Sequence, residues 1–229
     1  MMSMKKNREI PMSHTVTTND DTGLDTNHDI IGKHFLWLLC GRPGSGKSWL
    51  LTELLLNKEL LYKKFQHVFI YTPTPLEGIR MDLNLNWFTE FTPESLESCI
   101  DWADKENSQR VLVILDDVIG TLKNMQNSEK LMNLIFNRRH KLKNGVISFI
   151  ITTQKYILCP PRIRSCLTGI LFFKPMAKDL IHIREEHIFD WKTYYPMLFE
   201  QHFNKGEHNF IYVKTDIPAK ICLNFEIDL

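Results

Sequence analysis

The sequence predicts an α/β fold in which helices cover both faces of a mostly parallel central sheet. Three observations predict it. A glycine-rich loop separates an apolar run (residues 34–40) from a helix-forming run (49–57). Further short apolar runs at 67–72, 111–115 and 146–153 have the length of buried strands, with helical patterns between them, and one of these runs ends in two carboxylates. Alternating strands and helices form parallel βαβ units, whose ligands bind at the carboxyl edge of the sheet.

Composition places the chain among ordinary globular proteins. Its 229 residues are 43% hydrophobic and 24% charged, which suffices for one well-filled core. The formal net charge of +1 does not decide on a nucleic-acid partner, because a ring around DNA needs basic residues only where the polymer passes. Residues 1–30 are polar without apolar periodicity, so we expect a disordered tail there and a single domain over residues 31–229.

Cysteine usage and hydropathy indicate the compartment. The five cysteines are scattered, odd in number and without a C-x-x-C pair, which favours reduced thiols acting as core residues. No apolar run approaches the roughly 18 residues of a membrane span, and the N-terminus lacks a signal-peptide layout. We therefore expect an intracellular protein with no membrane span.

The glycine-rich loop is the strongest motif. It fits the phosphate-binding P-loop pattern G-x-x-x-x-G-K-[ST] at every fixed position, over the residues Gly41, Arg42, Pro43, Gly44, Ser45, Gly46, Lys47 and Ser48. The alternative is a surface turn with a chance lysine. A strand before the loop and a helix after it are the context that the motif requires, and they favour nucleotide binding.

Each residue type in the loop has a chemical reason. Glycines let backbone N–H groups turn inward around a triphosphate. Lys47 supplies a charge for the β and γ phosphates, Ser48 offers a hydroxyl to Mg²⁺, and the following helix directs its positive dipole end at the anion. ATP and Mg²⁺ are therefore the expected cofactors.

The next elements build the sheet around this loop. Residues 67–72 read as a buried strand, which makes a parallel βαβ unit with the first strand. Residues 92–95 (TPES) have the composition of a helix start, and Leu96, Ile100 and the pair Trp102–Ala103 can form its apolar face. This helix is expected to be structural.

The run Val111–Leu115 followed by Asp116 and Asp117 has the layout of a Walker B strand. Consecutive strand residues point to opposite sides, so only one acid can face the metal. We assign Asp116 to Mg²⁺ and Asp117 to the deprotonation of the attacking water, which implies hydrolysis. The alternative is two solvated aspartates at a strand end.

The nucleotide is expected to be ATP. Residues 117–120 also fit the D-x-x-G pattern of GTPases, but no N-K-x-D motif is present to read guanine.

An amphipathic helix is predicted over residues 129–142, and a basic group follows its apolar positions: Arg138, Arg139, His140, Lys141 and Lys143. Positive charge near a helix C-terminus is favourable by itself. An arginine at a subunit edge could equally stabilise the γ-phosphate held by a neighbouring subunit. The strand at 146–153 ends in Gln154, where a glutamine can sense the γ-phosphate or position water.

The C-terminal third is less informative. We expect a turn at 160–164, a strand at 167–173, a helix at 177–186 and a closing β hairpin from the runs 208–213 and 219–227. Arg164 is interpreted as a surface charge, with a phosphate-facing role as the alternative. The aromatic residues at 194, 195, 199 and 203 are interpreted as core rather than as base-stacking residues.

Together these features resemble the DNA-packaging ATPases of large double-stranded DNA viruses, in the poxvirus-type branch of the FtsK/HerA superfamily. The resemblance runs from about Ile31 to the C-terminus and includes the closing segment His208–Tyr212. The superfamily places an arginine finger before the strand that ends in a sensing glutamine, which implies these roles for Arg139, with Arg138 in reserve, and for Gln154. One departure is the Asp-Asp ending where Asp-Glu is usual.

The resemblance implies a P-loop NTPase three-layer sandwich that hydrolyses ATP to translocate double-stranded DNA into a preformed capsid. The implied assembly is a homo-oligomeric ring, a pentamer or hexamer, that meets capsid or portal vertex proteins. The implied location is the host cytoplasm or a viral assembly site, with association with the virion left open. Two alternatives stay open at this point: a P-loop kinase of a nucleotide or small molecule, and a non-hydrolysing nucleotide-gated assembly factor.

Overall fold

The computed structural model describes residues 34–74, 76, 84–118, 129–188, 194–206, 208–215 and 220–224. The tail predicted for residues 1–30 lies outside the described residues, as does part of the D-x-x-G segment.

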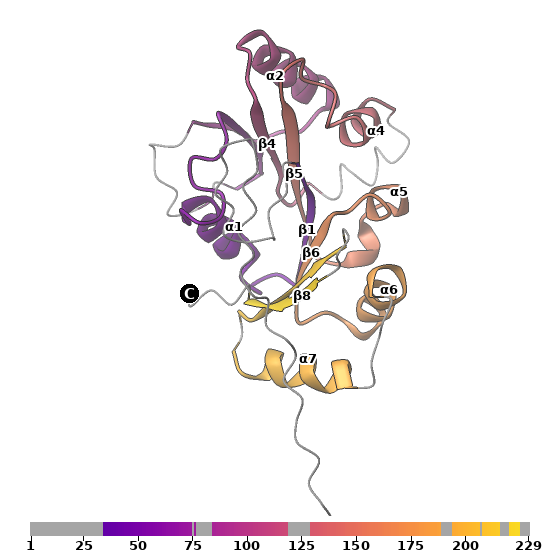
Figure 1. Ribbon diagram of the computed structural model, residues 1–229. Coiled ribbons are helices and arrows are strands. Elements are labelled where there is room, and N and C mark those ends of the chain that lie inside the picture. The colour runs from indigo at the N-terminus through magenta and orange to yellow at the C-terminus, as the bar shows by residue number, and fades with distance from the viewer. Residues whose placement is uncertain are drawn as a thin grey trace, which may run out of the picture.

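The described strands form one eight-stranded sheet in the order β3-β2-β4-β5-β1-β6-β7-β8 (Figure 1). Neighbours from β3 to β6 in this order pair in parallel, and β7 and β8 add an antiparallel hairpin at one side. The strand bounds are β1 (Leu36–Cys40), β2 (His67–Tyr71), β3 (Leu85–Phe88), β4 (Arg110–Leu115), β5 (Val146–Thr153), β6 (Gly169–Phe173), β7 (Phe210–Lys214) and β8 (Lys220–Leu223).

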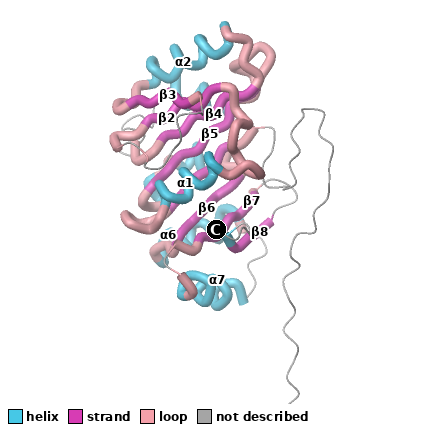
Figure 2. The backbone as a smooth tube through the Cα atoms, turned by 90° about the vertical axis from the view of Figure 1, so that its left-hand side faces the viewer, coloured by secondary structure: helices cyan, strands magenta, loops and turns pink. Residues whose placement is uncertain are grey.

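Helices cover both faces of this sheet: Figure 1 shows α1 on one side of it and α5 and α6 on the other, and Figure 2 shows α1 in front with α2 and α7 at its two ends. The described helices are α1 (Lys47–Leu56), α2 (Pro93–Lys105), α4 (Glu129–Phe136), α5 (Pro161–Arg164), α6 (Ala177–His187), α7 (Tyr194–Asn204) and the 3-10 helix η1 (Tyr156–Leu158). At the start of α2, the Thr92 side chain accepts a hydrogen bond from the Ser95 N–H, as its sequence predicts.

Alternation along each strand divides the apolar residues into two cores. In β4, Val111, Val113 and Leu115 face one core, and Leu112 and Ile114 face the other. The first core is completed by apolar residues of α2, α4, α5, α6 and α7, and the second by those of α1 and the loop that follows it. The parallel sheet with helices on both faces and the C-terminal hairpin are therefore confirmed.

Several local predictions were wrong. The helix predicted over 129–142 ends at Phe136, because the chain then turns toward the sheet and the Arg138 carbonyl accepts a hydrogen bond from the Ile147 N–H at 3.0 Å. The turn expected at 160–164 contains the short helix α5, with Pro161 in its first turn. Trp102 is 43% exposed instead of lying on the apolar face of α2. Strand β3 and helix α7 were not predicted.

The aromatic side chains of α7 agree with the core interpretation where they are described. Phe199 and Phe203 are buried and contact Phe172 of β6. Among the described residues, no helix is both long enough and apolar enough to cross a membrane.

Candidate nucleotide-binding site

The P-loop connects the end of β1 to the first turn of α1. The Gly41 N–H donates to the Thr153 carbonyl at 3.0 Å, which fixes the loop to the end of β5. Gly44 and Gly46 have φ values of 75° and 99°, in the left-handed region that favours glycine. A Cβ on Gly44 would meet no other atom within 4 Å, so the positive φ, and not a close contact, is what favours glycine at this position.

Two polar side chains of the loop fit an anion. The Lys47 side chain is buried, and its Nζ donates to the carbonyl oxygens of Gly41 and Arg42 at 2.7 and 3.1 Å, within the loop. The buried Oγ of Ser45 has no hydrogen-bond partner among the described residues. A triphosphate in the cradle supplies acceptors for both groups, and Ser48 lies exposed on the first turn of α1 beside them.

Asp116 is held between two threonines. The residue is 6% exposed, and its two carboxylate oxygens accept hydrogen bonds from Thr72 Oγ1 at 3.0 Å and Thr152 Oγ1 at 2.7 Å. Burial raises the pKa of this carboxyl, while the two hydroxyl hydrogen bonds oppose the rise. An oriented, buried carboxylate with free lone pairs suits a Mg²⁺ ion or a water bound to one.

Neither threonine was singled out from the sequence. They flank Asp116 because β4 lies between β2 and β5, with Leu115 opposite both Tyr71 and Ile151. Thr72 and Asp116, which directly follow β2 and β4, therefore meet Thr152 near the end of β5 at one edge of the sheet. Hydroxyl residues at the ends of two apolar runs were a signal that the sequence did contain.

Asp117 follows Asp116 in the chain, but its side chain is exposed to solvent. The backbone φ of Asp117 is 52°, and its N–H donates to Thr152 Oγ1 at 2.9 Å. A left-handed backbone is uncommon outside glycine, although Asp and Asn tolerate it. The bend turns the second acid away from the first, so the two carboxylates have different surroundings.

Gln154 is exposed one residue beyond Thr153, whose carbonyl binds the P-loop. The structure thus brings together the P-loop, Asp116, Asp117 and Gln154 at the carboxyl edge of the sheet, as the sequence predicts.

The structure places Arg138 and Arg139 at the opposite edge. Arg138 is next to Ile147 near the start of β5, whereas Thr153 at its end holds the P-loop. Six residues of strand separate the two points by about 20 Å, at roughly 3.3 Å per residue. Neither arginine can reach the P-loop of its own chain.

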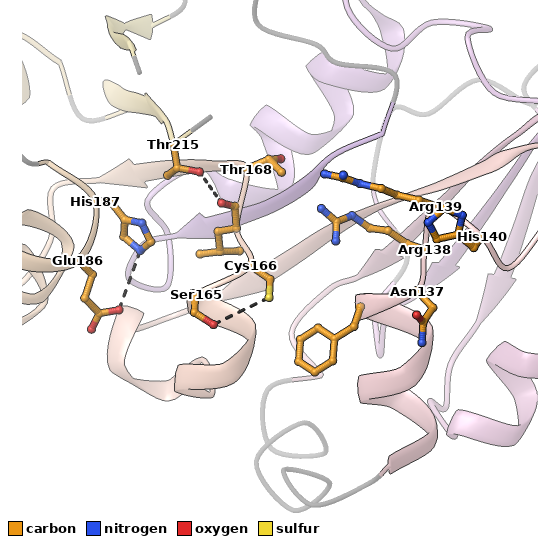
Figure 3. Close-up of a pocket in the computed structure, with 12 residues that line it drawn as sticks. Asn137, Arg138, Arg139, His140, Ser165, Cys166, Thr168, Glu186, His187 and Thr215 are labelled. Carbon is orange, nitrogen blue, oxygen red and sulfur yellow. Dashed lines mark hydrogen bonds and ion pairs between the residues drawn. The ribbon is translucent and has the colours of Figure 1, made fainter. Parts of the chain in front are cut away.

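The two arginines differ in burial. Arg138 is 5% exposed and its Nη1 donates to the Ile135 carbonyl at 3.2 Å, whereas Arg139 is exposed. Both extend from one turn into a hollow of about 860 Å³, toward Thr168 on its far wall (Figure 3). Arg139 is therefore the arginine of this pair that is available to another molecule.

The family model for the poxvirus A32 protein matches residues 26–187. The chain belongs to this family. The match includes the P-loop, both aspartates, Arg139 and Gln154, and it confirms the predicted resemblance. Among curated proteins none matches the chain.

Solved structures show the same fold at low sequence identity. The genome packaging NTPase B204 from Sulfolobus turreted icosahedral virus 2, in complex with ATP-gammaS, aligns with a TM-score of 0.57 and 14% identity over 84% of this chain and 97% of that chain. The DNA-packaging ATPase B204 from Sulfolobus turreted icosahedral virus aligns with a TM-score of 0.56 and 15% identity, over 82% and 96% of the two chains. The pCW3 conjugation coupling protein TcpA, in its monomer form with ATPgS, aligns with a TM-score of 0.53 and 13% identity, over 82% of this chain and 59% of its own.

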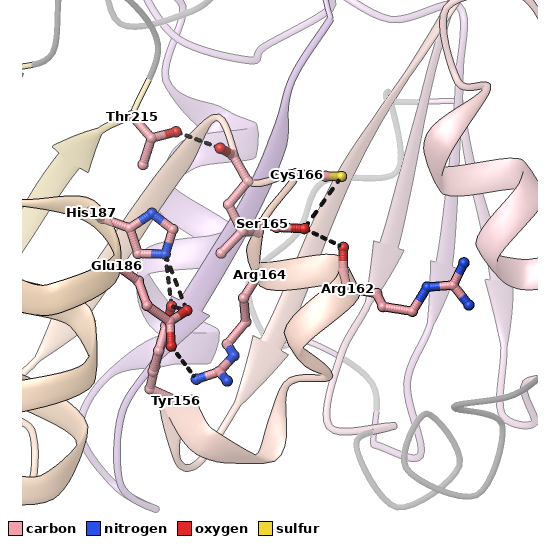
Figure 4. A network of polar contacts seen from close by, with 9 residues as sticks. Tyr156, Arg162, Arg164, Ser165, Cys166, Glu186, His187 and Thr215 are labelled. Atoms are coloured by element: carbon pink, nitrogen blue, oxygen red, sulfur yellow. Dashed lines mark hydrogen bonds and ion pairs between the residues drawn. The ribbon is translucent and has the colours of Figure 1, made fainter.

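In this A32-family chain Arg164 belongs to a polar network beneath the hollow (Figure 4). Its guanidinium pairs with Glu186 at 2.9 Å and lies over the Tyr156 ring at 4.9 Å. The Tyr156 hydroxyl contacts Glu186 Oε2 at 2.8 Å and His187 Nε2 at 2.7 Å. The interpretation of Arg164 as a surface charge was wrong, because the side chain is 12% exposed and is already bonded within its own chain.

This network predicts a loss of stability in acid. Burial lowers the pKa of His187 from 6.5 to about 4, and Arg164 adds to the effect while Glu186 opposes it. Because the folded pKa is depressed, the unfolded chain takes up the proton first, and stability falls as pH decreases from about 6.5 to about 4. At about 1.4 kcal/mol per pH unit, the loss is on the order of 3 kcal/mol.

Urea unfolding at several pH values checks this expectation. The free energy of unfolding should fall more steeply between pH 6.5 and 4 for the parent protein than for His187→Gln. The raised pKa of Asp116 is common to both proteins and cancels in the difference. Parallel curves for the two proteins would show that His187 does not titrate as described.

Proposed function

We propose that this protein is a viral genome-packaging ATPase, which hydrolyses ATP with Mg²⁺ to move double-stranded DNA into a preformed capsid. The observation that carries the proposal is the division of the hydrolytic groups between two edges of the sheet. The P-loop, the acids and Gln154 lie at one edge, and the exposed Arg139 lies about 20 Å away at the other. Membership of the poxvirus A32 family supports the viral role.

At the carboxyl edge, the chain's own groups divide the work of hydrolysis. Backbone N–H groups of the P-loop and Lys47 bind the phosphates, and Lys47 exchanges the carbonyls of Gly41 and Arg42 for phosphate oxygens. Ser48 and Asp116 hold Mg²⁺, which neutralises charge on the β and γ phosphates when it is bound. Asp117 accepts a proton from the attacking water, and Gln154 orients that water.

The other edge of the sheet completes the site of a neighbouring subunit. In a closed ring every subunit presents one edge to the next, so Arg139 of one copy reaches the γ-phosphate bound by another. Hydrolysis then depends on assembly into a pentamer or hexamer. The ring encloses double-stranded DNA and docks on a capsid or portal vertex, which places the protein at the site of viral assembly.

Steady-state phosphate release tests this function. The full chain is assayed with and without long double-stranded DNA, over protein concentrations that span assembly, and Lys47→Ala serves as the control for contaminating ATPases. Turnover is expected to rise with both DNA and protein concentration. Turnover indifferent to both would contradict a ring translocase, and phosphate transfer to an acceptor would indicate a kinase. Nucleotide binding without phosphate release under any condition would indicate an assembly factor.

A further inference from the structure

The order of the strands indicates which way a nucleotide held by the P-loop extends along the carboxyl edge of the sheet. The acids and Gln154, which act on the γ-phosphate in the proposed function, follow β4 and β5 on one side of β1. The end of β6 and the start of β7 lie on the other side of β1. A nucleotide whose γ-phosphate faces the acids extends its nucleoside toward β6 and β7.

Two exposed aromatic side chains lie on that side of the loop. Trp49, in the first turn of α1, is 43% exposed, and His208 lies exposed two residues before β7. Their ring centroids are 6.2 Å apart, with an angle of 32° between the ring planes. The pair therefore forms one partly exposed aromatic surface next to the P-loop.

His208 contacts the P-loop directly. His208 Nδ1 is 3.3 Å from the Ser45 carbonyl oxygen, and a Cβ added to Gly46 would come within 2.9 Å of the same atom. Because a carbonyl only accepts, Nδ1 carries the hydrogen in this contact. Glycine at position 46 is thus needed both for its φ and for the close approach of His208.

We propose that Trp49 and His208 form the nucleobase platform of the ATP site, with the base stacked on their exposed ring faces. The proposal rests on ATP binding as part of the proposed function. An aromatic surface suits a base because every base has a π-face, and stacking on one ring contributes about 1–3 kcal/mol. His208 lies beyond the part of the chain matched by the family model, which ends at residue 187.

Comparing two ligands that share the same phosphates separates base binding from phosphate binding. Isothermal titration calorimetry with MgATP and with magnesium tripolyphosphate is carried out on the full chain. Trp49→Ala and His208→Ala are expected to weaken MgATP binding by roughly 5- to 150-fold and to leave the affinity for tripolyphosphate unchanged. Trp49→Phe keeps an aromatic face and should bind MgATP nearly as well as the parent chain.

Trp102→Ala is the matched control, because Trp102 is equally exposed and also lies against a histidine, His67, but on α2. It should bind both ligands like the parent chain. Equal losses for both ligands in Trp49→Ala, or no loss for either, would overturn the platform. Failure of the parent chain itself to bind tripolyphosphate and MgATP would instead overturn the proposed function, and the platform with it.

Discussion

Asp117→Asn is expected to keep MgATP binding and to lower the turnover number by roughly 10²- to 10⁴-fold, the usual contribution of a general base. Asp117 suits the role of base because its side chain is exposed at the carboxyl edge of the sheet, where the P-loop lies. It accepts neither of the hydrogen bonds that Thr72 and Thr152 donate to Asp116. Asparagine is the suitable replacement because it tolerates the backbone φ of 52°, whereas alanine would add strain to the loss of the carboxylate. Equilibrium binding and single-turnover hydrolysis measure the two effects separately.

Two further variants separate the role of Asp117 from that of Asp116. Asp117→Glu restores the acid and should hydrolyse ATP measurably. Asp116→Asn should weaken Mg²⁺-dependent binding, because it removes the charge that Thr72 and Thr152 orient. If Asp117→Asn abolished nucleotide binding as well as turnover, the assignments of the two acids would have to be exchanged.

Arg139→Ala is expected to reduce DNA-stimulated turnover by roughly 10³- to 10⁵-fold without changing the affinity of the subunit for MgATP, because in the proposed function its guanidinium acts on the γ-phosphate bound by a neighbouring subunit. His140→Ala, an exposed change in the same turn, is the control and should keep full activity. Arg138 is less suitable for this test, since it is buried and donates to the Ile135 carbonyl, so its removal would also destabilise the fold.

Mixing two inactive variants tests whether the arginine acts between subunits. Lys47→Ala lacks a working phosphate site but supplies Arg139, and Arg139→Ala has the opposite defect. In rings assembled from equal amounts, about a quarter of the interfaces contain both intact groups, so activity should reappear on mixing. No recovery, in rings shown to contain both variants, would contradict action in trans.

Some of the site could be predicted from the sequence because it depends on neighbours along the chain. The P-loop, the strand that ends in Asp116 and Asp117, and the Gln154 position are each read from one contiguous run. Their shared edge follows from the geometry of parallel strands, whose carboxyl ends lie together.

Burial, pairing register and distant contacts are set only when the chain is folded. Arg138 and Arg139 are adjacent and chemically identical, yet the turn after α4 buries one and exposes the other. Arg164 looked like a surface charge because its ion-pair partner, Glu186, lies on a separate helix, α6, and the sequence does not show that the two meet.

The amino-acid sequence by itself determined the fold class, the P-loop and the placement of Asp116 and Asp117 after a buried strand. Each of these depends on local spacing and strand alternation. Tertiary structure decided which threonines hold Asp116, which arginine faces outward, and that His208 lies 163 positions along the chain from Ser45 yet contacts its carbonyl. The physical reason is that these contacts join separate strands at one sheet edge, and their register depends on the packing of the whole core.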